Sequence, residues 1–177
     1  MIVTKHYNDD CVKFSDSYEG QFDSVVTDPP YGIEYLGNDW DSYQNCIAFK
    51  SSTWESISRV LKPGGYMLIF GASKTFHRLT CAVEDSGLKI RDVLMWLYGQ
   101  GMPKSQNIGK KDPNWEGWGT GLKPCYEPIL LAQKPISEKT IVKNFQKHGV
   151  GGINIEDTRL ESGRWAGNVL HDGSDEV

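Results

Sequence analysis

Apolar and polar positions follow two different spacings along the first 133 residues. Strand-like segments occupy residues 2–7, 22–27, 66–70, 93–98 and 127–133, and the one at 66–70 is a continuous apolar run typical of a buried parallel strand. Apolar positions at helical spacing fall between them, at residues 12–18, 43–60 and 74–86. Strands separated by helices predict an α/β fold with a mostly parallel sheet and helices on both faces.

Glycine and proline mark the boundaries of these elements. Pro63-Gly64-Gly65 is predicted to end a helix and to turn the chain into the strand at 66–70. Residues 32–41, rich in glycine and acids, predict a loop that closes over the turn before it. Residues 99–124 have no regular spacing, and periodicity is lost again from residue 135. We therefore expect a core at 1–135 with a loop-rich insert at about 99–124, followed by an irregular tail at 136–177.

Length and composition indicate one ordinary globular domain, or most of one. The chain has 177 residues and no run of about 18 apolar residues that would span a membrane. Its N-terminus lacks the pattern of a signal peptide. The four cysteines lie at least 35 residues apart and the four histidines are scattered, so we expect neither a metal site nor a disulfide framework. A reducing compartment is the default for such a chain.

Charge is distributed unevenly around a net value of −4. Residues 99–148 hold eight lysines and four acids, a balance of +4, which leaves −8 on the rest of the chain. This segment either faces phosphate on an acidic body or is a solvated, lysine-rich loop. The candidates for DNA contact within it are Lys104, Lys110, Lys111, Trp115, Trp118 and Lys123.

The turn Thr27-Asp28-Pro29-Pro30-Tyr31-Gly32 carries the most informative chemistry of the chain. It follows the strand at 22–27, and ligands in open α/β sheets bind beyond the carboxyl ends of the strands. The two prolines stiffen the turn and carry no backbone N–H. Carboxylate and carbonyl acceptors beside an aromatic ring suit a flat, amino-bearing ring such as a nucleobase. An ordinary turn that closes a strand is an equal alternative.

Several motifs occur in one order over about residues 8–135. They are Asp10-Cys11, the stretch 22–32, Asp39-Trp40-Asp41, the stretch 59–65, and the stretch 121–129 that contains Glu127. With these motifs the chain resembles the amino-directed DNA methyltransferases that modify adenine N6 or cytosine N4, in particular phage and prophage members.

The resemblance implies a Rossmann-like fold, S-adenosylmethionine as cofactor and double-stranded DNA as partner, in the cytoplasm of a bacterial or phage-infected cell. Asp28 and the carbonyl of Pro29 would accept the hydrogens of an exocyclic amine, so that its lone pair attacks the methyl group directly. The base must leave the duplex stack to be reached, and Tyr31, which follows Pro30 in the same motif, would stack on it. An aspartate at position 28 favours adenine over cytosine as the target.

The resemblance also assigns cofactor binding to Asp10 and Asp28. Asp9 stands where the family commonly has glycine, and a helix-capping or turn-forming role for Asp9 and Asp10 is the alternative. The glycine turn that this family places after its target-recognition region is not recognisable in residues 136–177. We therefore expect an incomplete fold that binds the cofactor weakly by itself, with a second polypeptide or self-association supplying the other half. The tail would then be part of the target-recognition region or a linker.

Two other functions stay open from the sequence. One is a catalytically incomplete remnant or subunit that binds DNA or a partner methylase through its basic segment. The other is a methyltransferase that acts on RNA or on protein glutamine. Relatives that modify glutamine typically begin the proline turn with asparagine, so Asp28 disfavours that substrate.

Overall fold

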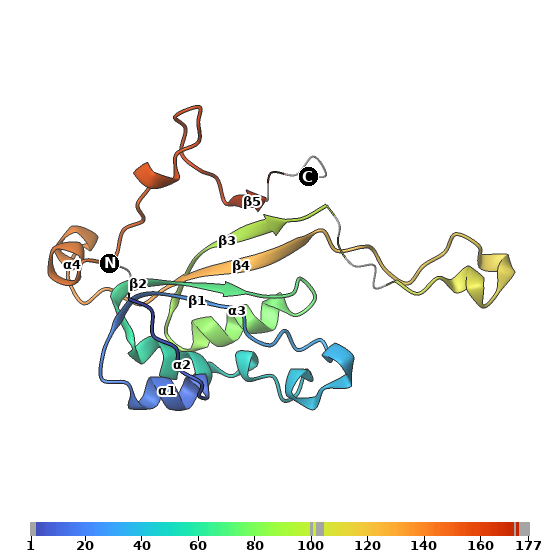
Figure 1. Cartoon of the computed structure of the whole chain (residues 1–177), viewed down its shortest axis with the longest axis horizontal. Coiled ribbons are helices and arrows are strands. Elements are labelled where there is room, and N and C mark those ends of the chain that lie inside the picture. The colour runs from blue at the N-terminus through green and yellow to red at the C-terminus, as the bar shows by residue number, and fades with distance from the viewer. Residues whose placement is uncertain (1–2, 100, 102–104, 172, 174–177) are drawn as a thin grey trace.

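Five strands form one mixed sheet in the computed structural model, which describes residues 3–99, 101, 105–171 and 173 (Figure 1). The strands are β1 (Phe22–Thr27), β2 (Leu61–Phe70), β3 (Lys89–Leu97), β4 (Tyr126–Gln133) and β5 (Val169–His171), in the spatial order β1-β2-β4-β3-β5. β1 is parallel to β2 and β5 is parallel to β3, whereas β4 is antiparallel to both of its neighbours. The α/β class is confirmed, but the sheet is not mostly parallel. The described residues between β3 and β4 contain no crossover helix, and consecutive strands without such a connection can pair antiparallel.

Three of the four described α-helices gather on one face of the sheet. α1 (Cys11–Ser17), α2 (Ser51–Arg59) and α3 (Phe76–Asp85) lie below it in Figure 1. α4 (Ile141–His148) lies past the end of the sheet at which β2 begins, so the described helices cover one face and not both. Short 3-10 turns are found at Tyr35–Gly37, Asp39–Asp41, Ile47–Phe49, Ile108–Lys110, Pro113–Trp115 and Glu156–Thr158.

The hydrophobic core lies between the sheet and the helices α2 and α3. Trp54 on α2 and Val83 on α3 are almost fully buried, together with Met67 and Ile69 of β2 and Leu130 of β4. Burying a side chain of this size stabilises the fold by about 1.5–3 kcal/mol. Because β2 and β4 are central in the sheet, their apolar runs are nearly continuous, which explains why the sequence predicts them well.

The Pro63-Gly64-Gly65 stretch lies inside β2, and the prediction that it ends a helix is wrong. α2 already ends at Arg59, and the β1–β2 register shifts across the stretch. Gly64 has a φ of +84°, and a Cβ added at Gly65 would lie 2.7 Å from the carbonyl oxygen of Asp23. The two glycines therefore permit a bulge in the strand that other residues would strain.

Helix α4 is absent from the sequence prediction, which treats residues from 135 onward as irregular. Thr140 caps its first turn, and Gly149, with a φ of +73°, ends it. Asn144 is fully buried on this helix and donates hydrogen bonds to the carbonyl oxygens of Pro63 at 2.9 Å and Val150 at 3.0 Å. The helix docks through a buried polar residue, and for this reason its apolar spacing is incomplete.

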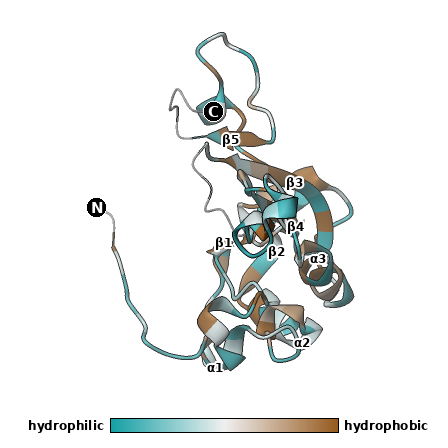
Figure 2. Cartoon of the chain, turned by 90° about the vertical axis from the view of Figure 1, so that its right-hand side faces the viewer, coloured by the Kyte–Doolittle hydropathy of each residue, from teal (hydrophilic) through white to brown (hydrophobic). Residues whose placement is uncertain are grey.

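The strand predicted at the N-terminus is also wrong. Residues 3–8 form no strand, and Figure 2 shows them leading away from the sheet as a mostly hydrophilic trace. Val3 is 75% exposed. A short apolar alternation forms a strand only where a neighbouring strand accepts its hydrogen bonds, and this segment has no such neighbour among the described strands.

Residues 105–121 form an arm that projects from the sheet between β3 and β4 (Figure 1, yellow). An isolated antiparallel bridge between Asn107 and Gly119 joins its two sides, and two 3-10 turns form its tip. The described part of the arm contains no α-helix and no strand of the sheet. In the same described part of the chain, no helix is long and apolar enough to cross a membrane.

Candidate active site

The Asp28-Pro29-Pro30-Tyr31 turn follows β1 directly, as the sequence predicts. The Cys46 thiol donates to the carbonyl oxygen of Pro30 at 3.2 Å, and burial raises the pKa of this thiol, which keeps it a donor. The Thr75 hydroxyl donates to the carbonyl oxygen of Tyr31 at 2.6 Å. No described residue donates to the carbonyl of Pro29. Hydrogen bonds to the carbonyl oxygens of Pro30 and Tyr31 therefore anchor the turn next to the Pro29 carbonyl, which the resemblance assigns to the target amine.

The loop after the turn is built around the carboxylate of Asp41. This side chain is buried and accepts hydrogen bonds from the backbone N–H groups of Gly32 at 2.7 Å, Ile33 at 3.3 Å and Tyr35 at 2.9 Å. Two non-glycine residues of the loop, Glu34 and Leu36, have positive φ angles of 58° and 53°. Such backbone costs about 1–3 kcal/mol per residue unless its surroundings hold it. Asp41 provides that hold, because it gathers three nearby donors on one anion.

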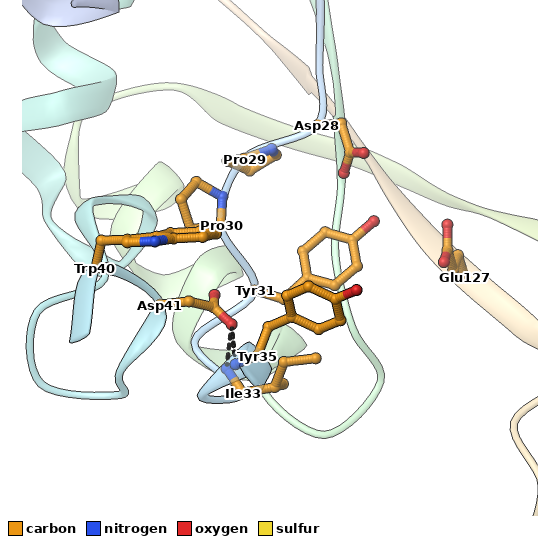
Figure 3. Close-up of a pocket in the computed structure, with 9 residues that line it drawn as sticks. All are labelled: Asp28, Pro29, Pro30, Tyr31, Ile33, Tyr35, Trp40, Asp41 and Glu127. Atoms are coloured by element: carbon orange, nitrogen blue, oxygen red, sulfur yellow. Dashed lines mark hydrogen bonds between the residues drawn. The ribbon is translucent and has the colours of Figure 1, made fainter. Parts of the chain in front are cut away.

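The turn and this loop enclose a cavity of about 630 Å³ (Figure 3). Its lining residues are Asp28, Pro29, Pro30, Tyr31, Ile33, Tyr35, Trp40, Asp41 and Glu127. The expected loop over the proline turn is thus confirmed. A second cavity of about 390 Å³ shares Tyr31, Ile33, Tyr35 and Glu127 and adds Lys74, Tyr98 and Tyr126 among others. Aromatic rings and carboxylates surround both cavities.

Glu127 is a site residue that sequence reasoning did not select. It lies near the start of β4, opposite Trp96 of β3, and lines both cavities. It belongs to the stretch 121–129, one of the motifs behind the resemblance, but nothing in the spacing indicates that its carboxylate faces the proline turn. The pairing of β2 with β4 is long range, and it brings this residue to Asp28.

The Tyr31 hydroxyl lies between two carboxylates. Figure 3 shows it directed toward the space between Asp28 and Glu127. Burial, then hydrogen bonding and charge from Asp28 and Glu127, raises the pKa of Tyr31 far above its usual value. The phenol therefore stays protonated, so it can donate a hydrogen bond at any pH at which the protein works.

Asp10 does not line either cavity. It is the N-cap of α1, and its Oδ1 accepts hydrogen bonds from the backbone N–H groups of Val12 at 2.9 Å and Lys13 at 3.0 Å. Asp9 accepts from the backbone N–H of Asp10 at 2.8 Å. The capping alternative thus describes the geometry of Asp10 but not that of Asp9, and a cofactor role for Asp10 stays a prediction.

Four of the DNA-contact candidates, Lys110, Lys111, Trp115 and Trp118, lie on the arm, and Lys123 follows it between Leu122 and Pro124, which line the second cavity. Lys110, Lys111 and Lys123 are exposed. Trp115 and Trp118 are 49% and 61% exposed, and their rings meet edge to face at a centroid distance of 5.6 Å. The remaining candidate, Lys104, lies outside the described residues. No group of three or more His, Cys, Asp or Glu side chains within the described ranges is arranged to hold a metal ion.

The fold and the site together define an α/β protein with a carboxylate and tyrosine cavity at the carboxyl end of a strand. Residues 22–171 match the N6_N4_Mtase family model, described as DNA methylase. The chain therefore belongs to this family of DNA methyltransferases.

Individual relatives agree with this membership. The Type II methyltransferase M.HindIII of Haemophilus influenzae is 26% identical over 205 residues, which cover 82% of this chain and 65% of the relative. The cytosine-N4-specific PvuII DNA methyltransferase has a similar fold, with a TM-score of 0.57 and 16% identity over 97% of this chain and 57% of the other. The putative DNA modification methylase TTHA0409 of Thermus thermophilus, complexed with S-adenosyl-L-methionine, gives a TM-score of 0.54 and 19% identity over 92% of this chain and 66% of the other. The chain thus spans 65% of the length of M.HindIII and 57% of that of the PvuII enzyme.

Proposed function

We propose that this chain carries the target-amine half of a DNA methyltransferase, which transfers a methyl group from S-adenosylmethionine to the exocyclic amine of a flipped base. The observation that carries the proposal is the cavity in which Asp28, Pro29, Tyr31 and Glu127 meet at the end of β1. Acceptors next to an aromatic face are what an amino-bearing base requires. Family membership supports DNA as the substrate.

The roles within the cavity follow from the chemistry of the amine. Its lone pair is delocalised into the base, so the nitrogen is a poor nucleophile. Hydrogen bonds from the amine to Asp28 and to the Pro29 carbonyl favour a tetrahedral nitrogen and free the lone pair. Tyr31 stacks on the base and fixes its plane, which contributes to the rate by orienting the amine. Adenine N6 is the favoured target, with cytosine N4 as the other amine of suitable geometry.

The described residues offer part of a site for the methyl donor. When bound, S-adenosylmethionine supplies a methyl group activated by a sulfonium cation. The first cavity offers a cation two carboxylates, Asp28 and Glu127, and the faces of Tyr35 and Trp40. Asp28 would lie beside the donor, and Asp10 would accept from its adenine amine. The membership of the chain in a methyltransferase family supports this choice of cofactor.

Transfer of a tritiated methyl group to unmethylated duplex DNA tests the function. We expect incorporation that is lost in Asp28→Ala, and nucleoside analysis of the product should yield N6-methyladenine. Incorporation that survives Asp28→Ala would refute the role of Asp28. A product of N4-methylcytosine would reassign the target amine.

The arm and the tail complete the proposal. We assign DNA contact to the insert at 99–124, because its described lysines, Lys110, Lys111 and Lys123, and its tryptophans are exposed. We assign target recognition or linkage to residues 136–177. Replacing Lys110 and Lys111 by glutamine should reduce the slope of log Kd against log salt by about 0.9 for each lost phosphate contact. Replacing Lys13 and Lys89, which are exposed elsewhere, is the matched control. Equal slopes in the two double variants would place the arm lysines on a solvated surface.

A second candidate is a subunit that is active only with a partner segment. β1 is one of the two outer strands of the described sheet, and Val26 on it is 66% exposed, which favours a further strand beside it. In this arrangement a second polypeptide or a second copy supplies the rest of the cofactor site. Methyl transfer that appears only after such a partner is added distinguishes this candidate from the first.

A further inference from the structure

The cavity places two carboxylates on a single phenolic hydroxyl. The Tyr31 hydroxyl faces the carboxylates of Asp28 and Glu127, which come from the turn after β1 and from β4, and all three residues line the first cavity (Figure 3). Figure 3 shows both carboxylates directed toward the same region. A tyrosine hydroxyl has one hydrogen to donate, whereas each ionised carboxylate only accepts. At any moment the hydrogen therefore serves one of the two acids.

The choice between these acids decides what Asp28 can do. If Tyr31 donates to Asp28, its hydroxyl occupies a lone pair of the Asp28 carboxylate that the target amine would otherwise use. If Tyr31 donates to Glu127, the ring is held by its far end and Asp28 keeps its acceptor positions. Glu127 is half-buried on the rigid strand β4, whereas Asp28 lies in the turn that follows β1. The acid on the rigid element is the better anchor, because it loses less freedom when it is fixed.

We propose that Glu127 is a positioning residue for methyl transfer: it takes the Tyr31 hydrogen bond, fixes the stacking ring, and leaves Asp28 to the target amine. This inference rests on the proposed function. Glu127 acts through the hydroxyl of Tyr31, so its effect must depend on that hydroxyl.

The contact itself is tested on the chain without any assay of activity. Thermal unfolding of Tyr31→Phe, Glu127→Ala and the double variant forms a cycle in which the two losses should not add, because both changes remove the same hydrogen bond. A second cycle pairs Tyr31→Phe with Glu84→Ala, an exposed acid on α3, and its losses should add. Additive losses in the Glu127 cycle would overturn the proposal.

The role is tested by rescue of methyl transfer. Glu127→Ala should lower kcat about tenfold or more, the equivalent of one hydrogen bond to a charged group, with little change in KM for DNA. In Glu127→Ala the hydroxyl turns to Asp28 and competes with the amine. Removing it in Tyr31→Phe/Glu127→Ala should restore kcat to the level of Tyr31→Phe alone. Glu127→Gln, which still accepts a hydrogen bond, should retain most of the activity.

The outcomes separate this inference from the function on which it rests. A double variant as slow as Glu127→Ala, or slower, would show that Glu127 supports the fold or touches the substrate, and would overturn the positioning role. If the wild-type chain transfers no methyl group to DNA while the Glu127 cycle is non-additive, the proposed function fails and the anchoring of Tyr31 stands.

Discussion

The geometry of the proline turn depends on Gly32. Its φ is +65°, and an added Cβ would lie 2.3 Å from the ring of Phe49. Gly37 in the same loop has a φ of +74°, but no atom lies within 4 Å of a Cβ added there. Replacing each glycine by alanine therefore separates the two effects, because both positions have a positive φ and only Gly32 has a close neighbour.

We predict that Gly32→Ala costs more stability than Gly37→Ala. Both alanines incur the strain of a positive φ, about 1 kcal/mol, and only Gly32→Ala also displaces an aromatic ring, for a total of roughly 2–4 kcal/mol. Denaturant unfolding of the two variants measures the difference. Equal losses would mean that Phe49 yields without cost.

Asp10 combines an observed role with a predicted one. As the N-cap of α1 it accepts two backbone hydrogen bonds, and the family resemblance assigns it to the cofactor. Asp10→Ala removes both functions, whereas Asp10→Ser keeps a capping oxygen and removes the charge.

We predict a split between these two variants. Asp10→Ala should lower the free energy of unfolding by about 1 kcal/mol, and Asp10→Ser should stay close to the wild type. If Asp10 also binds the cofactor, both variants should raise the KM for S-adenosylmethionine about tenfold in the methyl-transfer assay, the equivalent of one lost hydrogen bond. A KM unchanged in Asp10→Ser would leave the residue with its capping role alone.

At the scale of elements, the sequence predicts the part of the site that lies on one turn and misses the part that comes from another strand. The sequence order places Asp28 to Tyr31 at the end of a strand, and local chemistry is enough for this prediction. Glu127 reaches the same cavity through the pairing of β2 with β4, which brings together residues far apart in the chain. No local spacing encodes such a contact. The same holds for α4, whose buried Asn144 interrupts the apolar pattern that would have indicated a helix.

Asp41 lets the loop serve as a wall of the cavity. Its carboxylate holds three backbone N–H groups, and we predict that Asp41→Asn disrupts them because an amide presents donors to donors. The expected loss is about 1–3 kcal/mol of unfolding free energy, with a higher KM for DNA as the cavity wall loosens. Asp39→Asn is the matched control, since the exposed Asp39 side chain accepts from the Asn45 side chain, at 2.8 Å, and holds no backbone N–H of the loop. Comparable losses in both variants would contradict the special role of Asp41.

At the scale of the whole molecule, the fold class followed from the sequence and the strand directions did not. The alternation of apolar runs and helical segments defined an α/β protein, which the sheet and helices confirm. The antiparallel placement of β4 depends on the arm between β3 and β4, which replaces a crossover helix and has no apolar pattern. The error at residues 3–8 has the same origin, because a strand is defined by its partner and not by its own sequence.

The outer strand β1 offers the last test of how this molecule works. β1 is one edge of the described sheet, its Val26 is 66% exposed, and an exposed apolar edge strand is prone to pair with another chain. We predict that the chain self-associates as its concentration rises and that Val26→Lys suppresses this, because a charge on the edge opposes pairing. Val3→Lys is the control, since Val3 is 75% exposed in a segment without regular structure. Light scattering over a concentration series measures the mass, and a wild type that stays monomeric, or equal effects of the two lysines, would show that β1 is not an association edge.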